Sequence, residues 1–502
     1  MNKNAAVWPL FLLPGLALFV GCGSSASHST APAPAPTPVS APGPLSESNL
    51  NLIFVVSEDL AYNAAGDVNP GTANLTDRGL QRSLLMATFL RQHVLGSKNV
   101  TGIYTLAPMT HLQTADKDPD MAAPETVQQF ALLNQVTLSS SPAGGTPYTA
   151  NSYPLNVSYA AAGAPSGVAV QARPCANCQG LDFNDENGDN ETLVTGILKA
   201  NVPGFFVFSA PWETTKSLLT NLNALEGYNL TLPASYSGPN SVYAISIAPS
   251  GGASLVTFDS NLAPPSTYPA LNSPALASAP CAAQAPFTIS ITGGAAGAVI
   301  PPEINRNETL YIIRHAEAHP QGSWDDGNYV GAGQWRALDL PSALAGKISP
   351  DQVYSSDPAQ AIQGTASSSS NSYWSYVRPA LTVEPYAIAN NLPFHLAASF
   401  DLFATSPPQL STQASDFFFT GEQFSNQKIL LAWEHDRIAT TVNALLSSYF
   451  PHGIAPMAPA WPSADYDTIW TVKLDAVGNV TVDNALCEGI ESAALPVTAP
   501  QF

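Results

Sequence analysis

The chain has few charged residues and very few basic ones. Charged side chains make up 11% of its 502 residues, and 17 lysines and arginines stand against 37 aspartates and glutamates, for a formal net charge of −20. A surface of this sign repels nucleic-acid phosphates, so we expect no nucleic-acid partner. Hydrophobic residues reach 45%, which is enough to fold. The length exceeds what one ordinary core holds, so two domains are expected.

Long apolar runs are also scarce, and the one at residues 5–20 is too short for a membrane span. It follows the short polar start MNKN and therefore predicts an export signal. It ends in Phe-Val-Gly-Cys at 19–22, which resembles a bacterial lipoprotein box. We expect a signal peptide over 1–21 and a lipid anchor on Cys22. The protein would then be exported and held at a membrane, in the periplasm or at the cell surface; an ordinary secretory signal is the alternative.

Two stretches have a composition that cannot bury a core. Serine, alanine and proline dominate residues 22–48, which we interpret as a tether between the lipidated cysteine and the folded part. Proline, alanine, serine and glycine are also frequent in residues 266–302, which we interpret as a linker with a short strand at 286–291. These stretches set the limits of the folded domains.

Cysteine is rare, with five residues including Cys22. The other four are an even number in a chain expected to be exported, which favours disulfides. Cys175 and Cys178 form a C-x-x-C, and zinc would need a second pair or nearby histidines. We therefore expect a local disulfide there, which leaves Cys281 to pair with Cys487 by elimination.

The chain contains two halves with the same order of features. Each has an apolar strand followed by polar residues, a helix start with Gly-x-x-Arg, two further strand-to-helix steps and a terminal hairpin. The sequence therefore predicts two tandem α/β domains, at 49–265 (the first half) and 303–495 (the second half). Each is expected to be a three-layer domain with a mainly parallel sheet and helices on both faces. The matching stretches are 51–60 with 309–318, 75–90 with 330–346, 102–115 with 352–366, 204–225 with 428–446, and 241–259 with 468–483.

Two apolar strands of the second half end in chemically active side chains. The strand in LYIIRHAEA runs into Arg314 and His315, and the strand in ILLAWEHDR runs into Glu434, His435 and Asp436. Ligands bind beyond the carboxyl ends of parallel strands. We therefore expect His315 and His435 to line one pocket, where an arginine can hold an anion and a histidine can attack it.

This part of the chain resembles the histidine phosphatase (phosphoglycerate-mutase-like) superfamily. The hallmark of that family is Arg-His-Gly/Ala-Glu at a strand end, and the resemblance covers residues 308–483. It implies the histidine-phosphatase fold and a phosphatase acting on a small phosphorylated substrate. The residues that carry it are Arg314-His315-Ala316-Glu317, the helix start Gly333 to Ala337, the strand end Tyr354-Ser355-Ser356, the pair Thr365-Ala366, and His435.

The resemblance implies a phosphohistidine mechanism. His315 would attack phosphorus as a neutral imidazole, Arg314 would bind the phosphoryl oxygens, and His435 would add positive charge. Positioning and electrostatics would supply the catalysis, so no metal or organic cofactor is expected. For the proton donor we favour Asp436 over Glu384, which is placed in a strand at LTVEP.

One position departs from the family pattern. Gln360 stands where a second phosphate-binding arginine is usual, and it brings no charge. Arg378 or Arg437 could substitute in space, and Glu317 is a further candidate for substrate contact. Glu434 is the third candidate for the proton donor; alternatively, it orients His435.

Two other polar groups are given structural roles. Arg336 on its predicted helix is expected to form a salt bridge at the surface or between the domains, rather than to bind phosphate. The acidic segment 182–191 is interpreted as a solvated loop, because its glycine is out of register for a calcium loop.

The first half lacks the catalytic pattern. Val56-Ser57 stand at the Arg-His position, Pro211 stands at the position of His435, and Met109 lies near the position of the second arginine. His111 is placed on the following helix, where it does not restore the pocket. We expect this half to be catalytically inactive. The sequence thus predicts an extracytoplasmic phosphatase; the alternative is a non-catalytic surface lipoprotein that binds a phosphorylated ligand or a protein.

Overall fold

The computed structural model describes most of the chain after residue 41, and structural statements refer to that part. The described residues from 42 to 502 form one compact unit. No described helix is long and apolar enough to cross a membrane. The predictions for 1–21, Cys22, most of the tether, Cys175, Cys178, 182–190, Gln360 and Thr365-Ala366 lie outside the described residues. The described residues are 42–62, 65–138, 148–151, 153–158, 191–271, 281–318, 326–359, 361–363, 373–397 and 407–502.

The first half contains a six-stranded sheet in the order β10-β9-β1-β8-β2-β7. The neighbours β1/β8, β8/β2 and β2/β7 are parallel, and β1/β9 and β9/β10 are antiparallel. The predicted hairpin at 241–259 is β9 with β10. The strands are β1 (Leu50–Val56), β2 (Gly102–Leu106), β7 (Asn156–Ser158), β8 (Gly204–Ala210), β9 (Ser241–Ile247) and β10 (Ala253–Asp259).

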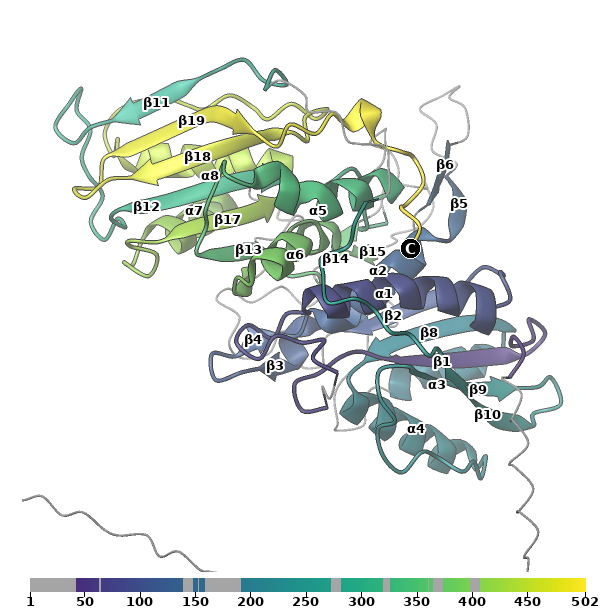
Figure 1. The fold of residues 1–502 in the computed structure, drawn as a ribbon. Coiled ribbons are helices and arrows are strands. Elements are labelled where there is room, and N and C mark those ends of the chain that lie inside the picture. Colours follow the sequence, from purple (N-terminus) through teal and green to yellow (C-terminus); the bar gives the residue numbers. More distant parts are fainter. Residues whose placement is uncertain are drawn as a thin grey trace, which may run out of the picture. The chain divides into compact units, whose positions relative to one another are not determined.

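The second sheet repeats this order with one strand added, as β11-β19-β18-β12-β17-β13-β16. Its central strand β12 has the same neighbours and directions as β1 (Figure 1). The strand predicted at 286–291 is β11, and it pairs with β19 in this sheet. The strands are β11 (Thr288–Ile291), β12 (Glu308–Arg314), β13 (Gln352–Ser356), β16 (Phe394–Ala397), β17 (Lys428–Trp433), β18 (Thr468–Leu474) and β19 (Val480–Cys487).

The prediction of mainly parallel sheets is wrong for this second sheet. Three of its strand pairs are parallel and three are antiparallel. The short connection between β18 and β19 allows only antiparallel pairing, and β11 adds a further antiparallel strand at the outer edge of β19. Three small ladders were not predicted: β3 (Leu112–Gln113) with β4 (Asp118–Pro119), β5 (Gln135–Leu138) with β6 (Tyr148–Asn151), and β14 (Ala361–Gln363) with β15 (Tyr373–Ser375).

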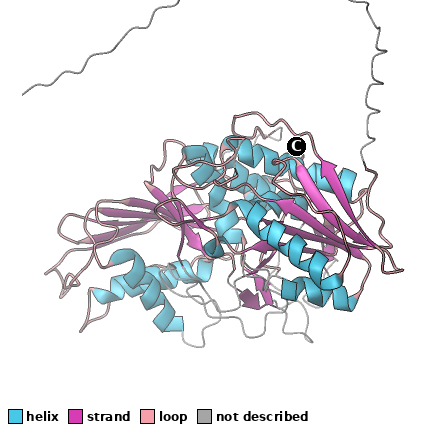
Figure 2. Ribbon diagram, turned by 90° about the horizontal axis from the view of Figure 1, so that it is seen from below, coloured by secondary structure: helices cyan, strands magenta, loops and turns pink. Residues whose placement is uncertain are grey.

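Helices accompany both groups of strands (Figure 2). The first long helix, α1, begins at Thr76, whose hydroxyl caps it by accepting from the Gly79 amide at 3.2 Å. The segment LTVEP, predicted as a strand, lies inside α6. The helices are α1 (Asp77–Phe89), α2 (Ala122–Leu132), α3 (Glu191–Ala200), α4 (Trp212–Glu226), α5 (Gly331–Leu344), α6 (Arg378–Asn390), α7 (Pro407–Phe419) and α8 (His435–Ser448), with the short turns η1 (Leu90–Val94), η2 (Pro108–Thr110) and η3 (Ser492–Ala494).

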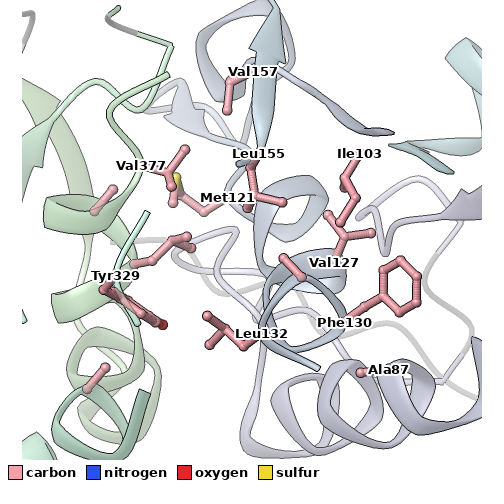
Figure 3. Close-up of a cluster of buried hydrophobic side chains, with 14 of the residues drawn as sticks. Ala87, Ile103, Met121, Val127, Phe130, Leu132, Leu155, Val157, Tyr329 and Val377 are labelled. Atoms are coloured by element: carbon pink, nitrogen blue, oxygen red, sulfur yellow. The ribbon is translucent and has the colours of Figure 1, made fainter. Parts of the chain in front are cut away.

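The two halves share a hydrophobic core. Strand β1 is buried on both faces, and Ile53 and Val55 point into the same cluster as Phe130 of α2. That cluster continues into the second half through Tyr329 and Val377 (Figure 3). Helices α1 and α2 therefore pack with α5 and α6, and the two halves bury apolar surface against each other.

Polar contacts cross the same junction. Gln128 and Asn328 form two amide hydrogen bonds with each other, at 2.8 and 3.1 Å, and both side chains are fully buried. A disulfide joins Cys281, which precedes β11, to Cys487 at the end of β19. This is the pairing that the sequence left by elimination, and it fixes the edge of the second sheet.

Candidate active site

His315 leaves the sheet directly after β12 and is 2% exposed. Its amide donates to the Trp433 carbonyl at 3.1 Å, which continues the parallel pairing of β12 with β17. The ring Nδ1 lies 2.8 Å from the Ala316 carbonyl oxygen. Because a carbonyl only accepts, Nδ1 carries the hydrogen, and Nε2 of the neutral ring keeps its lone pair.

The surroundings of His315 favour its uncharged form. Burial lowers the pKa of His315 well below its usual value, and the positive charges of Arg378, Arg314 and His435 lower it further. The imidazole is therefore neutral at ordinary pH, which is the form that can act as a nucleophile.

Arg314, the last residue of β12, is held by a loop that precedes β18. Its guanidinium lies 3.8 Å from the ring centroid of Tyr466. Its Nη1 donates to the carbonyls of Ser463 and Asp465, the latter at 3.2 Å. Its buried Nε has no hydrogen-bond partner among the described residues. The arginine is thus fixed on one side and keeps a donor for an anion.

Arg378 supplies a second cation at this site. It begins α6, and its backbone amide donates to the Gly327 carbonyl at 3.1 Å. Its guanidinium lies 4.7 Å from the Tyr376 ring, and its charge is the strongest of those that lower the pKa of His315. The other predicted substitute, Arg437, is partly exposed in the first turn of α8. Of the two arginines that the sequence offered in place of the missing one, the structure therefore places Arg378 near His315.

His435 begins α8, directly after Glu434 and the end of β17. The β12/β17 register sets Arg314 opposite Trp433, so both strands deliver their histidines at one edge of the sheet. His435 Nδ1 forms an ion pair with Glu434, and its Nε2 lies 3.6 Å from an oxygen of Asp436. The structure thus brings His315 and His435 together, with Asp436 beside the second.

The acids of this segment differ in environment. Burial raises the pKa of Glu434, but its hydrogen bond to His435 and the positive charge of that ring outweigh burial and leave the pKa below its usual value. An ionised Glu434 orients His435 and has no proton to give. The Asp436 side chain is 81% exposed. The ligand atoms of these three residues lie within 4.8 Å of one another, a spacing that a metal ion could also use.

Glu384 does not lie in a strand, and the prediction that placed it there is wrong. Thr382 of the same helix accepts from the Ala316 amide at 2.8 Å, and a residue two positions later is turned about 200° away around the helix. Burial raises the pKa of Glu384 well above its usual value, and the charge of Glu125 in the first half raises it further. Its carboxyl is thus directed to the junction between the halves.

Glu317 is occupied by an internal ion pair. Arg336 Nε lies 2.9 and 3.0 Å from its two carboxylate oxygens, and the Ser492 hydroxyl donates to it at 2.7 Å. Arg336 also pairs with Glu488 and is fully buried inside the second half. Arg336 forms a salt bridge, as expected, but the expected location at the surface or between the domains is wrong. A guanidinium can be buried in this way when carboxylates surround it. Glu317 therefore holds the loop after β12 in place.

Three residues at the site were missed by the sequence reasoning. The rings of Tyr376 and Tyr466 lie edge-on to His315, with centroids 6.0 and 6.1 Å away. The Thr382 hydroxyl fixes the amide that follows His315. Each comes from a segment at least 60 residues away along the chain, in a loop or a helix without a motif, so no local signal marked them.

The equivalent edge of the first half has different residues. Ser57 follows β1, and Pro211 precedes α4, as the sequence indicated. The prediction that placed His111 on a helix is wrong. It follows the short turn η2, and its Nε2 forms an ion pair with Asp59. Asp59, His111 and Asp120 also form a group with metal-like spacing. This edge is therefore polar but carries no Arg-His pair.

The similarity to known proteins is confined to solved structures. No family model and no curated protein matches the sequence. SixA from Agrobacterium tumefaciens is 20% identical, covers 33% of this chain and 89% of its own, and has a TM-score of 0.19. A phosphoserine phosphatase from Entamoeba histolytica, in complex with 3-phosphoglyceric acid, is 16% identical, covers 36% of this chain and 100% of its own, and has a TM-score of 0.24. YhfR of Bacillus stearothermophilus is 14% identical, covers 37% of this chain and 99% of its own, and has a TM-score of 0.20. These proteins are members of the histidine phosphatase superfamily.

Proposed function

We propose that the second half is a phosphatase that hydrolyses a small phosphate monoester through a phosphohistidine on His315. One observation carries the proposal: a buried histidine, held neutral with Nε2 bearing the lone pair, lies among the positive charges of Arg314, Arg378 and His435. Such a group can attack phosphorus, and the cations can neutralise the charge that develops on the phosphoryl oxygens.

The reaction has two balanced steps. In the first, the Nε2 lone pair of His315 forms a bond to phosphorus, the ester P–O bond breaks, and the leaving oxygen takes a proton from Asp436. In the second, the Asp436 carboxylate takes a proton from water as the water oxygen attacks phosphorus. The N–P bond breaks, inorganic phosphate leaves, and both residues return to their starting states. Arg314 and Arg378 hold the phosphoryl oxygens throughout.

The choice of Asp436 as proton donor follows from the alternatives. Glu434 is ionised beside His435, and Glu384 is directed to the junction with the first half. Asp436 has an exposed side chain 3.6 Å from His435 Nε2, and we assign it to the leaving group for that reason. Gln360, if it contacts the substrate, would add a neutral hydrogen bond.

We extend the proposal to the organisation of the chain. The matching strand orders support two tandem domains of histidine-phosphatase type, at 49–265 and 303–495, with 266–302 as the linker and the first domain inactive in this reaction. The signal-like residues 1–21 and Cys22 support export, with a lipid anchor and an extracytoplasmic site of action.

The test is hydrolysis of an aryl phosphate by the full chain in detergent. We expect His315→Ala to lower kcat/KM by ~10³-fold or more, because it removes the nucleophile. His452→Ala is the matched control, since His452 is exposed in the turn after α8 and outside the site. Equal rates for His315→Ala and the wild type would refute the proposal that the protein is a phosphatase and would favour the alternative of a phosphate-binding protein.

The covalent step has its own readout. We expect Asp436→Asn to accumulate protein that carries one phosphoryl group, because breakdown of the intermediate needs the carboxylate as a base. An alkaline quench followed by mass spectrometry of the His315 peptide detects it. A phosphoryl group found on any other residue would contradict the assignment of the nucleophile.

A further inference from the structure

The inactive first half gathers three potential metal ligands at the edge that corresponds to the catalytic edge of the second half. Asp59 follows β1, His111 follows β2 and the turn η2, and Asp120 lies just before α2. Strands β1 and β2 both run parallel to β8, so their carboxyl ends lie at one edge of the sheet. This is the edge at which α/β sheets bind their ligands.

The spacing of the three groups fits a small cation. Their ligand atoms lie within 4.8 Å of one another, and His111 Nε2 is 4.0 Å from Asp120 Oδ2. Two atoms bound to zinc at about 2.0–2.2 Å are separated by at most about 4.4 Å. The three side chains therefore need only a small adjustment to share one ion.

Both carboxylates are held in the orientation that a site requires. One oxygen of Asp59 accepts from the Ala61 amide, and one oxygen of Asp120 accepts from the Ala122 amide at 3.0 Å. In each case the second oxygen faces His111. Such outer contacts fix metal-binding carboxylates before an ion arrives.

A buried oxygen in this group lacks a donor. Asp120 is 1% exposed, and its Oδ2 has no hydrogen-bond partner among the described residues. Leaving a buried carboxylate oxygen unsatisfied is costly, and a bound cation removes that cost. Asp59 and Asp120 share one imidazole, and Glu213 adds a third negative charge that acts on both Asp120 and His111.

From this geometry we propose that Asp59, His111 and Asp120 bind one divalent transition-metal ion of the zinc type. An imidazole nitrogen among the ligands favours such an ion over Mg²⁺ and Ca²⁺, which prefer oxygen alone. Water completes a tetrahedral shell. The His111 side chain is 28% exposed, whereas those of Asp59 and Asp120 are buried, so the ion enters from the histidine side.

The experiment uses the full chain in detergent, freed of metal with a chelator and then titrated with Zn²⁺ at pH 7.5. We expect one ion per chain that resists millimolar Mg²⁺ and Ca²⁺, and a rise in the thermal midpoint, because the ion binds only the folded state. His111→Ala and Asp120→Asn should each weaken binding by at least about tenfold to a hundredfold.

Two matched variants separate this site from the rest of the chain. His435→Ala removes the other group of potential ligands, Glu434 to Asp436, and His452→Ala removes an exposed histidine. Both should bind zinc like the wild type. Zinc binding that is lost in His435→Ala but kept in His111→Ala would overturn the proposal. A wild type that binds no zinc would also overturn it, because Asp59 would then be paired only with a protonated His111.

Two measurements do not depend on the folding of variants. Co²⁺ added to the wild type should give the visible absorption of a tetrahedral site, and Zn²⁺ should displace it. Anomalous diffraction at the zinc edge should place the ion between Asp59, His111 and Asp120. Anomalous density elsewhere, or none, would overturn the assignment.

Discussion

Glu308 allows a quantitative test of how burial controls stability in the second half. It is the first residue of β12, six positions before Arg314 at the end of the strand, and it is 1% exposed. Asn305 donates to one carboxylate oxygen at 2.9 Å, while the other has no hydrogen-bond partner among the described residues. Burial raises the pKa of Glu308 to about 8, although the hydrogen bond from Asn305 lowers it in part.

The sign and size of the effect follow from proton linkage. The unfolded carboxyl has a pKa of 4.5 and the folded one about 8, so the folded state binds more protons between these values. Stability from this group is complete below pH 4.5 and falls until pH 8. A difference of about 3.5 pKa units corresponds to a loss of about 5 kcal/mol, at 1.36 kcal/mol per unit.

Glu308→Gln removes this titration while it preserves the shape of the side chain and the bond from Asn305. We expect the variant to match the wild type near pH 4.5 and to become progressively more stable than it, by up to about 5 kcal/mol at pH 9. Other buried acids titrate in both proteins and cancel in the difference. Urea unfolding monitored by tryptophan fluorescence, at several pH values, measures this difference.

The matched control is Glu303→Gln, five residues earlier, where the side chain is exposed. It should follow the wild type at every pH. A Glu308→Gln variant whose stability differs from the wild type by a constant amount from pH 4.5 to 9 would refute the reasoning, because no buried proton would then be linked to folding.

Two further predictions concern the site and its border. Arg378→Gln should lower kcat/KM for an aryl phosphate by about 10²-fold or more, because it removes a cation beside His315. Arg437→Gln should change kcat/KM by less than about tenfold. Steady-state kinetics measure both effects, and a larger loss in Arg437→Gln would show that Arg437 is the second cation. Glu384→Gln should leave kcat unchanged and should become increasingly more stable than the wild type as the pH rises above 4.5, because the raised pKa keeps the folded carboxyl protonated where the unfolded one ionises; a loss of activity without loss of stability would make Glu384 the proton donor.

The sequence was informative where the signal was local. Apolar runs and their polar ends located β12 and β17, and so the edge at which Arg314, His315 and His435 meet. The repeated order of features located strands with the same neighbours in both halves. These elements are specified by neighbouring residues, and packing did not override them.

The remaining parts depend on burial that a sequence does not display. Residues Arg378 to Ile388 of α6 are buried on all sides, so the helix shows no apolar stripe, and its β-branched residues imitate a strand. Because this segment was predicted as a strand, the position of Arg378 at the start of a helix beside His315 was not predicted. Arg336 was placed at the surface or between the domains because its partners Glu317 and Glu488 lie 19 and 152 positions away along the chain.

The amide pair between Gln128 and Asn328, within the core that both halves share, has a consequence for cutting the chain. Residues 42–271 and 281–502, produced as two separate fragments, would still bury α1 and α2 against α5 and α6. The fragments should co-elute until a denaturant separates them. Expression of residues 303–495 alone would instead expose apolar helix faces and buried amides to water, and it should give aggregates. The first half would then act as the partner that keeps the second half soluble.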